Sequence, residues 1–198
     1  MHARVLRAAD YQRMRWKNGG GWTTQLATSP TNGDGAFDWR ISIADVESDG
    51  AFSTFPKCDR YIALLDGIGM ELRSDGSEPL RLERRLQFIH FDGAANTYGK
   101  LISGPVRDFN VIVRRDAYTA EVLHRPLVGP MVFLPESVTW FVYLAGGRAD
   151  FKLAGAVQEL ENGESLLLVP DASTDRVVLN GGGEVVLVKL SPSAPGRS

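Results

Sequence analysis

Short alternating runs of apolar and polar residues dominate the chain. From Trp39 to Ala44, and again from Asp108 to Val113, apolar residues recur at every second position, which is typical of a β-strand with one buried face. The runs Tyr61–Leu65 and Trp140–Leu144 are apolar almost throughout, which predicts strands buried on both faces. No segment shows the apolar spacing of an amphipathic helix of three turns. The pattern therefore predicts an all-β protein.

Two segments contain three consecutive glycines, and their flanks differ. Asn180–Gly183 lies between the valine-rich runs 177–179 and 185–188, so we expect a β-hairpin with a tight turn at Asn-Gly. Gly19–Gly21 is flanked by tryptophans and cations instead. Glycines allow a backbone to approach a ligand closely, so this segment is a candidate binding loop, with a simple turn as the alternative.

A weak internal repeat suggests two β-units of similar design. Residues of the same kind recur at a constant offset of 79 positions. The matching pairs are Phe55 and Leu134, Pro56 and Pro135, Tyr61 and Trp140, Leu65 and Leu144, and Gly67 and Gly146. We therefore expect a double barrel or sandwich, with a first unit over residues 1–120 and a second over 121–198. The N-terminal segment is expected to cross onto one of the sheets.

Charge and cysteine content exclude several classes of protein. Lysine and arginine number 22 against 24 acidic residues, for a net charge of −2, whereas nucleic-acid-binding domains are usually basic. The single cysteine, Cys58, cannot form an intramolecular disulfide, which fits a reducing compartment. The sequence contains neither a signal peptide nor an apolar run long enough to cross a membrane. We expect a cytoplasmic protein without nucleic-acid or membrane partners.

The histidines argue against a metal centre. His2, His90 and His124 are widely separated and show no ligand spacing. In metal-binding cupins a Gly is followed after five residues by His-x-His, whereas here Gly50 leads to Pro56-Lys57-Cys58. We therefore expect no metal and no cofactor, and Cys58 shows no signature of a nucleophile.

The polar faces of two predicted strands supply the best candidate site. Arg40 and Ser42 share one face of their strand, and Asn110 lies with Asp108 on a face of another. These faces could simply be solvated. Alternatively, they could line a lumen together with Arg60, where guanidinium groups would bind a carboxylate bidentately. The sequence leaves both interpretations open.

Five ordered motifs between residues 13 and 115 resemble the HutD/Ves family. They are Trp16-Lys17-Asn18-Gly19-Gly20-Gly21-x-Thr23, Phe37-x-Trp39-Arg40-x-Ser42-x-Ala44-x-Val46, Gly50-x-Phe52-Ser53-x-Phe55-Pro56, Asp59-Arg60 and Gly104-Pro105-x-x-Asp108-Phe109-Asn110. The resemblance implies a bicupin, with two RmlC-like jelly-roll (double-stranded β-helix) units that lack the usual metal ligands. It also implies a link to histidine utilisation, with N-formylglutamate as the suggested ligand, or to a stress response. The chain departs from the family pattern at Arg15, Gln25, Ala51 and Lys57.

We expect a small carboxylate ligand rather than catalysis, and a role as a regulator or sink in amino-acid catabolism. The rivals are a metal-independent sugar epimerase or isomerase, which needs an opposed acid and base, and an interaction module with a filled interior. A homodimer is compatible with each of these three functions. The expected ligand-binding residues are Trp16, Lys17, Asn18, Gly19, Gly20, Gly21, Trp39, Arg40, Ser42, Arg60 and Asn110.

Overall fold

The computed structural model describes residues 1–30, 36–153, 155–172 and 176–193. These residues form sixteen β-strands and one 3-10 turn at Ala8–Asp10, without an α-helix, so the predicted all-β class is confirmed. The strands fall into two compact units. The first is Tyr11–Tyr118, and the second combines Met1–Asp10 with residues 119–193. Within the described ranges, no helix is long and apolar enough to span a membrane.

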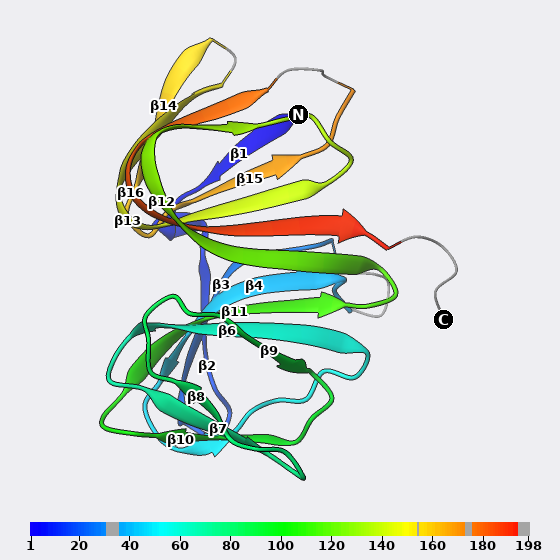
Figure 1. Cartoon of the computed structure of the whole chain (residues 1–198), viewed down its shortest axis with the longest axis vertical. Coiled ribbons are helices and arrows are strands. Elements are labelled where there is room, and N and C mark those ends of the chain that lie inside the picture. The colour runs from blue at the N-terminus through cyan, green and yellow to red at the C-terminus, as the bar shows by residue number, and fades with distance from the viewer. Residues whose placement is uncertain (31–35, 154, 173–175, 194–198) are drawn as a thin grey trace. The chain divides into compact units, whose positions relative to one another are not determined.

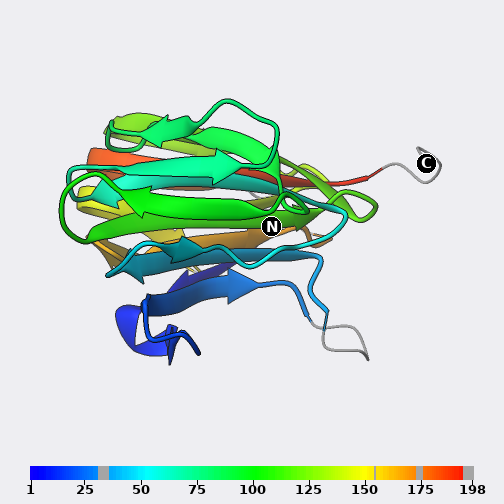
Figure 2. The ribbon, with the colours of Figure 1, turned by 90° about the horizontal axis from the view of Figure 1, so that it is seen from below.

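The Tyr11–Tyr118 unit contains two antiparallel sheets (Figures 1 and 2). In sheet order, the six-stranded sheet is β2 (Gln12–Arg15), β3 (Gly21–Thr28), β4 (Trp39–Val46), β11 (Val106–Arg114), β6 (Cys58–Asp66) and β9 (Ile89–Asp92). The four-stranded sheet is β5 (Gly50–Ala51), β10 (Thr97–Leu101), β7 (Met70–Ser74) and β8 (Leu80–Leu82). Short strands separated by glycine-containing turns follow the sequence pattern.

One face of the six-stranded sheet packs on the four-stranded sheet, and we call it the inner face. Ala44 from β4 and Leu64 from β6 join a buried cluster with Met70 and Leu72 from β7 and Leu82 from β8. The burial of these side chains excludes water from the space between the sheets and provides the main stabilisation of this unit.

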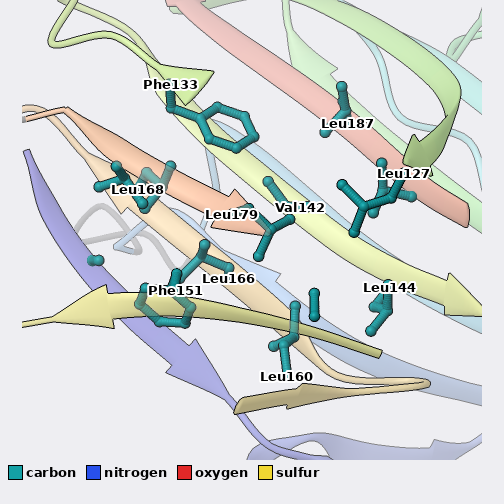
Figure 3. Close-up of a cluster of buried hydrophobic side chains, with 14 of the residues drawn as sticks. Leu127, Phe133, Val142, Leu144, Phe151, Leu160, Leu166, Leu168, Leu179 and Leu187 are labelled. Atoms are coloured by element: carbon teal, nitrogen blue, oxygen red, sulfur yellow. The ribbon is translucent and has the colours of Figure 1, made fainter. Parts of the chain in front are cut away.

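The second unit is built around one six-stranded sheet. Its strands, in sheet order, are β1 (His2–Leu6), β15 (Ser165–Val169), β13 (Thr139–Leu153), β16 (Val177–Pro192) and β12 (Tyr118–Phe133), with β14 (Ala156–Glu161) also paired to β13. Leucine, valine and phenylalanine side chains from five of these strands form its core, including Val142, Leu166, Leu179 and Leu187 (Figure 3).

The hairpin predicted at Asn180–Gly183 is wrong. These residues lie inside the continuous strand β16, where they pair with Gly147–Asp150 of β13 beside an irregularity in the register. A Cβ atom on Gly183 would lie 2.0 Å from the Gly146 carbonyl oxygen, and one on Gly181 would lie 2.3 Å from that of Arg148. The glycines therefore permit a close approach of two long strands. The alternation of apolar and polar residues could not distinguish such a contact from a turn.

The N-terminal segment crosses onto a sheet of the second unit. β1 pairs with β15, with Ala3 opposite Leu168 and Val5 opposite Leu166. The expected division had placed the first ten residues in the first unit, whereas the structure groups them with residues 119–193. The physical reason is that Ala3 and Leu6 bury their side chains there.

Candidate functional site

The register of three central strands brings two arginines into one row. β11 lies between β4 and β6, and its Ile112 is directly opposite Arg40 on one side and Arg60 on the other. Side chains in register share a face of the sheet, so Arg40 and Arg60 project the same way. Two strand spacings separate their Cα atoms, which is about 10 Å.

This row lies on the inner face of the six-stranded sheet. Ser42 and Asn110 form the next row, because they are directly paired, and Asp108 lies opposite Ala44 and Leu64 in the row beyond. Arg60 is only 7% exposed, and Asp108 is fully buried. The interpretation that these polar faces simply look to solvent is therefore wrong. Ser42 and Asn110 are each 3% exposed.

A chain of hydrogen bonds runs inward from Arg60. Its Nε donates to Asn110 Oδ1 at 3.0 Å, and its Nη1 donates to the Ser53 carbonyl oxygen at 3.4 Å. The Asn110 amide nitrogen donates in turn to Asp108 Oδ1. Asp108 Oδ2 and Arg40 Nε are buried without a hydrogen-bond partner. We call Arg40, Arg60, Asp108 and Asn110 the arginine cluster.

Phenylalanine rings surround both guanidinium groups. The Arg60 Cζ lies 4.7 Å from the ring centroid of Phe52 and 5.4 Å from that of Phe91. Both arginines also contact Phe55, with the Cζ of Arg40 at 5.0 Å and that of Arg60 at 5.9 Å from its centroid. Aromatic faces attract cations electrostatically, so these rings replace part of the water that burial removes. Phe37 completes the set, 4.9 Å from the Arg40 Cζ.

The cluster holds two guanidinium groups against one carboxyl group, and burial disfavours every charge in it. Burial, together with a smaller effect of the charge of Arg40, lowers the pKa of Arg60 to about 10, while the charge of Asp108 opposes the shift. Burial likewise lowers the pKa of Arg40. Burial raises the pKa of Asp108 to about 7, against the attraction of Arg60. An anion that entered here would meet an excess of positive charge.

The first glycine segment forms a turn at the other end of the sheet. Trp16 N–H donates to the Gly21 carbonyl, and Gly19 N–H donates to the Trp16 carbonyl, each at 3.0 Å. Gly19 has a φ of 74°, and a Cβ on Gly21 would lie 2.2 Å from the Asp45 carbonyl oxygen. Turn geometry and close packing therefore account for two of its three glycines.

The structure does not bring this turn to the arginine cluster. Gly21 pairs with Val46, six residues along β4 from Arg40, which corresponds to about 20 Å. Lys17 and Asn18 are exposed in the turn, and Gly20 is half-buried there. Trp16 packs against the core between the two sheets, and its Nε1 donates to Thr23 Oγ1 at 2.8 Å.

Of the eleven expected site residues, the structure gathers Arg40, Ser42, Arg60 and Asn110. Trp39 is buried but lies on the opposite face of β4 from Arg40, so the apolar wall consists of phenylalanines instead. Sequence reasoning omitted Asp108, although its alternation with Asn110 was the available signal. The four phenylalanines gave no periodic signal, because only Phe91 lies within a strand.

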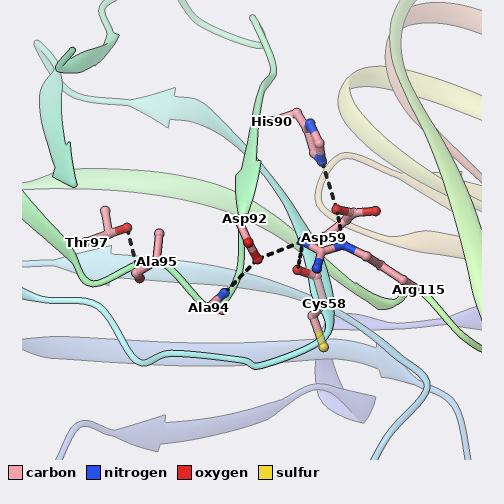
Figure 4. Close-up of polar contacts among 8 residues, drawn as sticks. All are labelled: Cys58, Asp59, His90, Asp92, Ala94, Ala95, Thr97 and Arg115. Carbon is pink, nitrogen blue, oxygen red and sulfur yellow. Dashed lines mark hydrogen bonds and ion pairs between the residues drawn. The ribbon is translucent and has the colours of Figure 1, made fainter. Parts of the chain in front are cut away.

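Arg115, His90 and Cys58 lie outside the arginine cluster and have structural roles. Arg115 donates from Nε to Asp59 at 2.8 Å and from Nη2 to Asp92 at 2.7 Å, while His90 Nε2 lies 3.2 Å from Asp59 Oδ1 (Figure 4). Cys58 is buried at the start of β6, and burial raises the pKa of its thiol. In the ranges that the structure describes, no three His, Cys, Asp or Glu side chains gather closely enough to hold a metal ion.

A cavity of about 340 Å³ lies in the second unit, away from the arginine cluster. Its described lining includes the acids Glu136 and Asp171 but no lysine or arginine, and the amino group of Met1 forms an ion pair with Asp171. Acidic walls repel an anion, so this cavity is poorly suited to a carboxylate.

Sequence comparisons relate the chain to two kinds of bacterial protein. An uncharacterized 21.2 kDa protein in the hutC 3′ region of Pseudomonas putida is 35% identical over 187 residues, covering 94% of this chain and 96% of that protein. Protein Ves of Cronobacter sakazakii is 37% identical over 108 residues, which is 54% of this chain and 58% of Ves.

Solved structures give the same relationship. The structure of HutD from Pseudomonas fluorescens SBW25 (formate condition) has a TM-score of 0.84 and 32% identity, covering 98% of this chain and 100% of that one. The bacterial pirin YhhW of Escherichia coli, solved with nickel(II), has a TM-score of 0.71 at 10% identity, covering 98% of this chain and 100% of that one. At this low identity, the similarity to the pirin shows only that the two proteins share a cupin-like β fold. The sequence profile of HutD matches residues 8–187, and the chain therefore belongs to the HutD family.

Proposed function

We propose that this protein binds a small carboxylate metabolite, resembling formylglutamate, at the arginine cluster. The observation that carries the proposal is the convergence of Arg40 and Arg60 on the inner face, where one carboxyl group, Asp108, opposes two guanidinium groups. The Phe55 ring, which both arginines contact, limits the separation of the guanidinium groups. A short dicarboxylate, or a carboxylate with a nearby carbonyl oxygen, fits such a pair.

The cellular role that we propose follows from the relatives. One of them is described as lying in a hutC 3′ region, and a solved neighbour is named HutD, which supports a function in histidine or amino-acid catabolism, as a regulator or a sink for an intermediate. Similarity to Ves supports the stress-response variant of this role. We further propose a cytoplasmic protein whose two units are both cupin jelly rolls, with a homodimer as a possible assembly.

The rival function, a metal-independent epimerase or isomerase, has less support. It needs an acid and a base opposed across one pocket. His90 and Tyr61 are paired in register on neighbouring strands, one position from Phe91 and Arg60, so both point to the other face of the sheet. Turnover of a nucleotide-sugar would favour the enzyme.

Calorimetric titration with N-formylglutamate, succinate and glutarate tests the proposal. We expect Arg60→Ala to weaken binding by roughly 1.5–3 kcal/mol, the usual contribution of a charge-assisted hydrogen bond. Arg60→Lys should recover only part of that, because an ammonium group lacks the bidentate fork. Arg73→Ala is the matched control, since Arg73 is an exposed arginine on the four-stranded sheet. Equal affinities in Arg60→Ala and Arg73→Ala would contradict the proposal.

A further inference from the structure

Asp108 is placed so that a ligand bound at the two arginines must change its environment. It lies two residues from Asn110 on the same face of β11, and the Asn110 side chain bridges it to Arg60. Its Oδ1 accepts the hydrogen bond from Asn110, while Oδ2 is buried without a partner. One carboxylate oxygen is thus available to hold a proton.

The charged groups around Asp108 are few. From β6, Arg60 attracts it, and from β4 the charge of Asp45 acts against its ionisation. Arg40 lies in the same row as Arg60 and repels it. The buried cluster between the two sheets consists of apolar side chains, which offer no compensation. They are Ala44, Val46, Ile62, Leu64, Met70, Leu72, Leu82 and Val106.

We propose that Asp108 is the proton-linked counter-ion of the arginine cluster, so that a carboxylate binds at Arg40 and Arg60 together with one proton. Before binding, ionised Asp108 partly neutralises the arginines. The ligand takes over that role, and a proton from solvent forms an O–H bond at Asp108 Oδ2. The O–H or N–H bond that held this proton on a hydronium ion or a buffer acid breaks as the new bond forms. The charge of the cluster after binding is that before binding plus the charges of the ligand and the proton. This inference rests on the proposed carboxylate site.

The sign of the coupling follows from electrostatics. A ligand carboxylate paired with Arg60 screens the one charge that favours ionised Asp108, and it adds a negative charge nearby. Both effects favour the protonated acid, and burial already places its pKa at about 7. Affinity should therefore be nearly constant below about pH 6. Above pH 7 it should fall by up to about tenfold per pH unit, the limit for uptake of one proton.

Isothermal titration of the wild-type protein with N-formylglutamate measures the proton directly. Titrations at pH 7.5 in Tris and in triethanolamine, two cationic buffers with different ionisation enthalpies, give the number of protons taken up. We expect between about one half and three quarters of a proton per ligand, because Asp108 with a pKa of about 7 is about three-quarters ionised at pH 7.5. We also expect the affinity to decrease from pH 7 to pH 9. The ligand's own carboxylates stay ionised in this range, so the proton must bind to the protein.

Two variants separate the role of Asp108 from that of other acids. Asp108→Asn keeps the shape of the side chain but cannot titrate, so it should bind with no proton uptake and with constant affinity from pH 6 to 9. Asp66→Asn, at the exposed end of β6, should behave as wild type. Wild-type binding without proton uptake, or an unchanged pH dependence in Asp108→Asn, would overturn the role of Asp108 alone. Absence of binding at pH 6 would overturn the carboxylate site as well. The wild-type titrations decide the matter even if Asp108→Asn does not fold.

Discussion

The burial of Asp108 makes a quantitative prediction about the stability of the ligand-free protein. The folded protein holds a proton on this group up to about pH 7, whereas an Asp in the unfolded chain loses it near pH 3.9. Between these values the folded state binds more protons than the unfolded state, so the free energy of unfolding falls as pH rises. Stability from this group is thus present below about pH 4 and is lost progressively up to about pH 7.

The magnitude follows from the width of that window. The slope is about 1.4 kcal/mol per pH unit while only the folded state is protonated. Between pH 5 and pH 8 this condition holds for roughly two pH units, so Asp108 alone should remove about 2.5 kcal/mol of stability. Arg60 adds nothing in this range, because its pKa of about 10 leaves it charged in both states.

Urea unfolding of wild type and Asp108→Asn, followed by tryptophan fluorescence at pH 5, 6, 7 and 8, isolates this contribution. Other titrating groups cancel when the wild-type free energy is subtracted from that of the variant. We expect this difference to increase by about 2.5 kcal/mol from pH 5 to pH 8, in favour of the variant. In Asp66→Asn the difference should not change. A constant difference in Asp108→Asn would refute the raised pKa of Asp108.

Three further predictions concern parts of the fold outside the arginine cluster. Gly181→Ala and Gly183→Ala should each destabilise the protein by at least about 2 kcal/mol, because the new Cβ would overlap backbone oxygens of β13. Thermal melting measures this loss. Gly182→Ala is the control and should be nearly neutral, because a Cβ atom on Gly182 would have no other atom within 4 Å. Arg115→Ala should lower the free energy of unfolding by no more than about 1 kcal/mol, because the ion pairs of Arg115 are solvent-exposed. This loss should be smaller in 1 M NaCl, and a larger loss that does not depend on salt would contradict the prediction. The Cys58 thiol should react with Ellman's reagent slowly at pH 8 and rapidly in urea, because it is buried and its pKa is raised; fast reaction of the folded protein would contradict its burial.

Strand alternation predicted the most useful part of the site. A period of two is a local property, so the shared faces of Arg40 and Ser42, and of Asp108 and Asn110, could be identified without the fold. Pairing depends on the register between distant strands, which alternation does not fix. That Arg40 and Arg60 both flank Ile112 became visible only in the structure.

The two glycine segments show why the rest could not be predicted. Both contain Asn-Gly-Gly-Gly, and in both a glycine is required where a Cβ would meet a backbone oxygen from a distant strand. Local sequence predicts a turn in each case, but close approach of backbones depends on tertiary packing. The rings around the arginines were missed for a related reason, since Phe37, Phe52 and Phe55 lie outside the strands.

The pairing of β1 with β15 has a consequence for the order of folding during synthesis. Ala3 meets its partner Leu168 only after some 165 further residues have been made, whereas Tyr11–Tyr118 is a continuous segment. Domains generally fold as units while the chain emerges, so we expect the unit with the arginine cluster to fold first. Until β15 is synthesised, β1 lacks its partner strand while the unit that follows it in the sequence folds. The second unit is therefore expected to complete its fold last, because β1 and β15 come from segments far apart in the sequence.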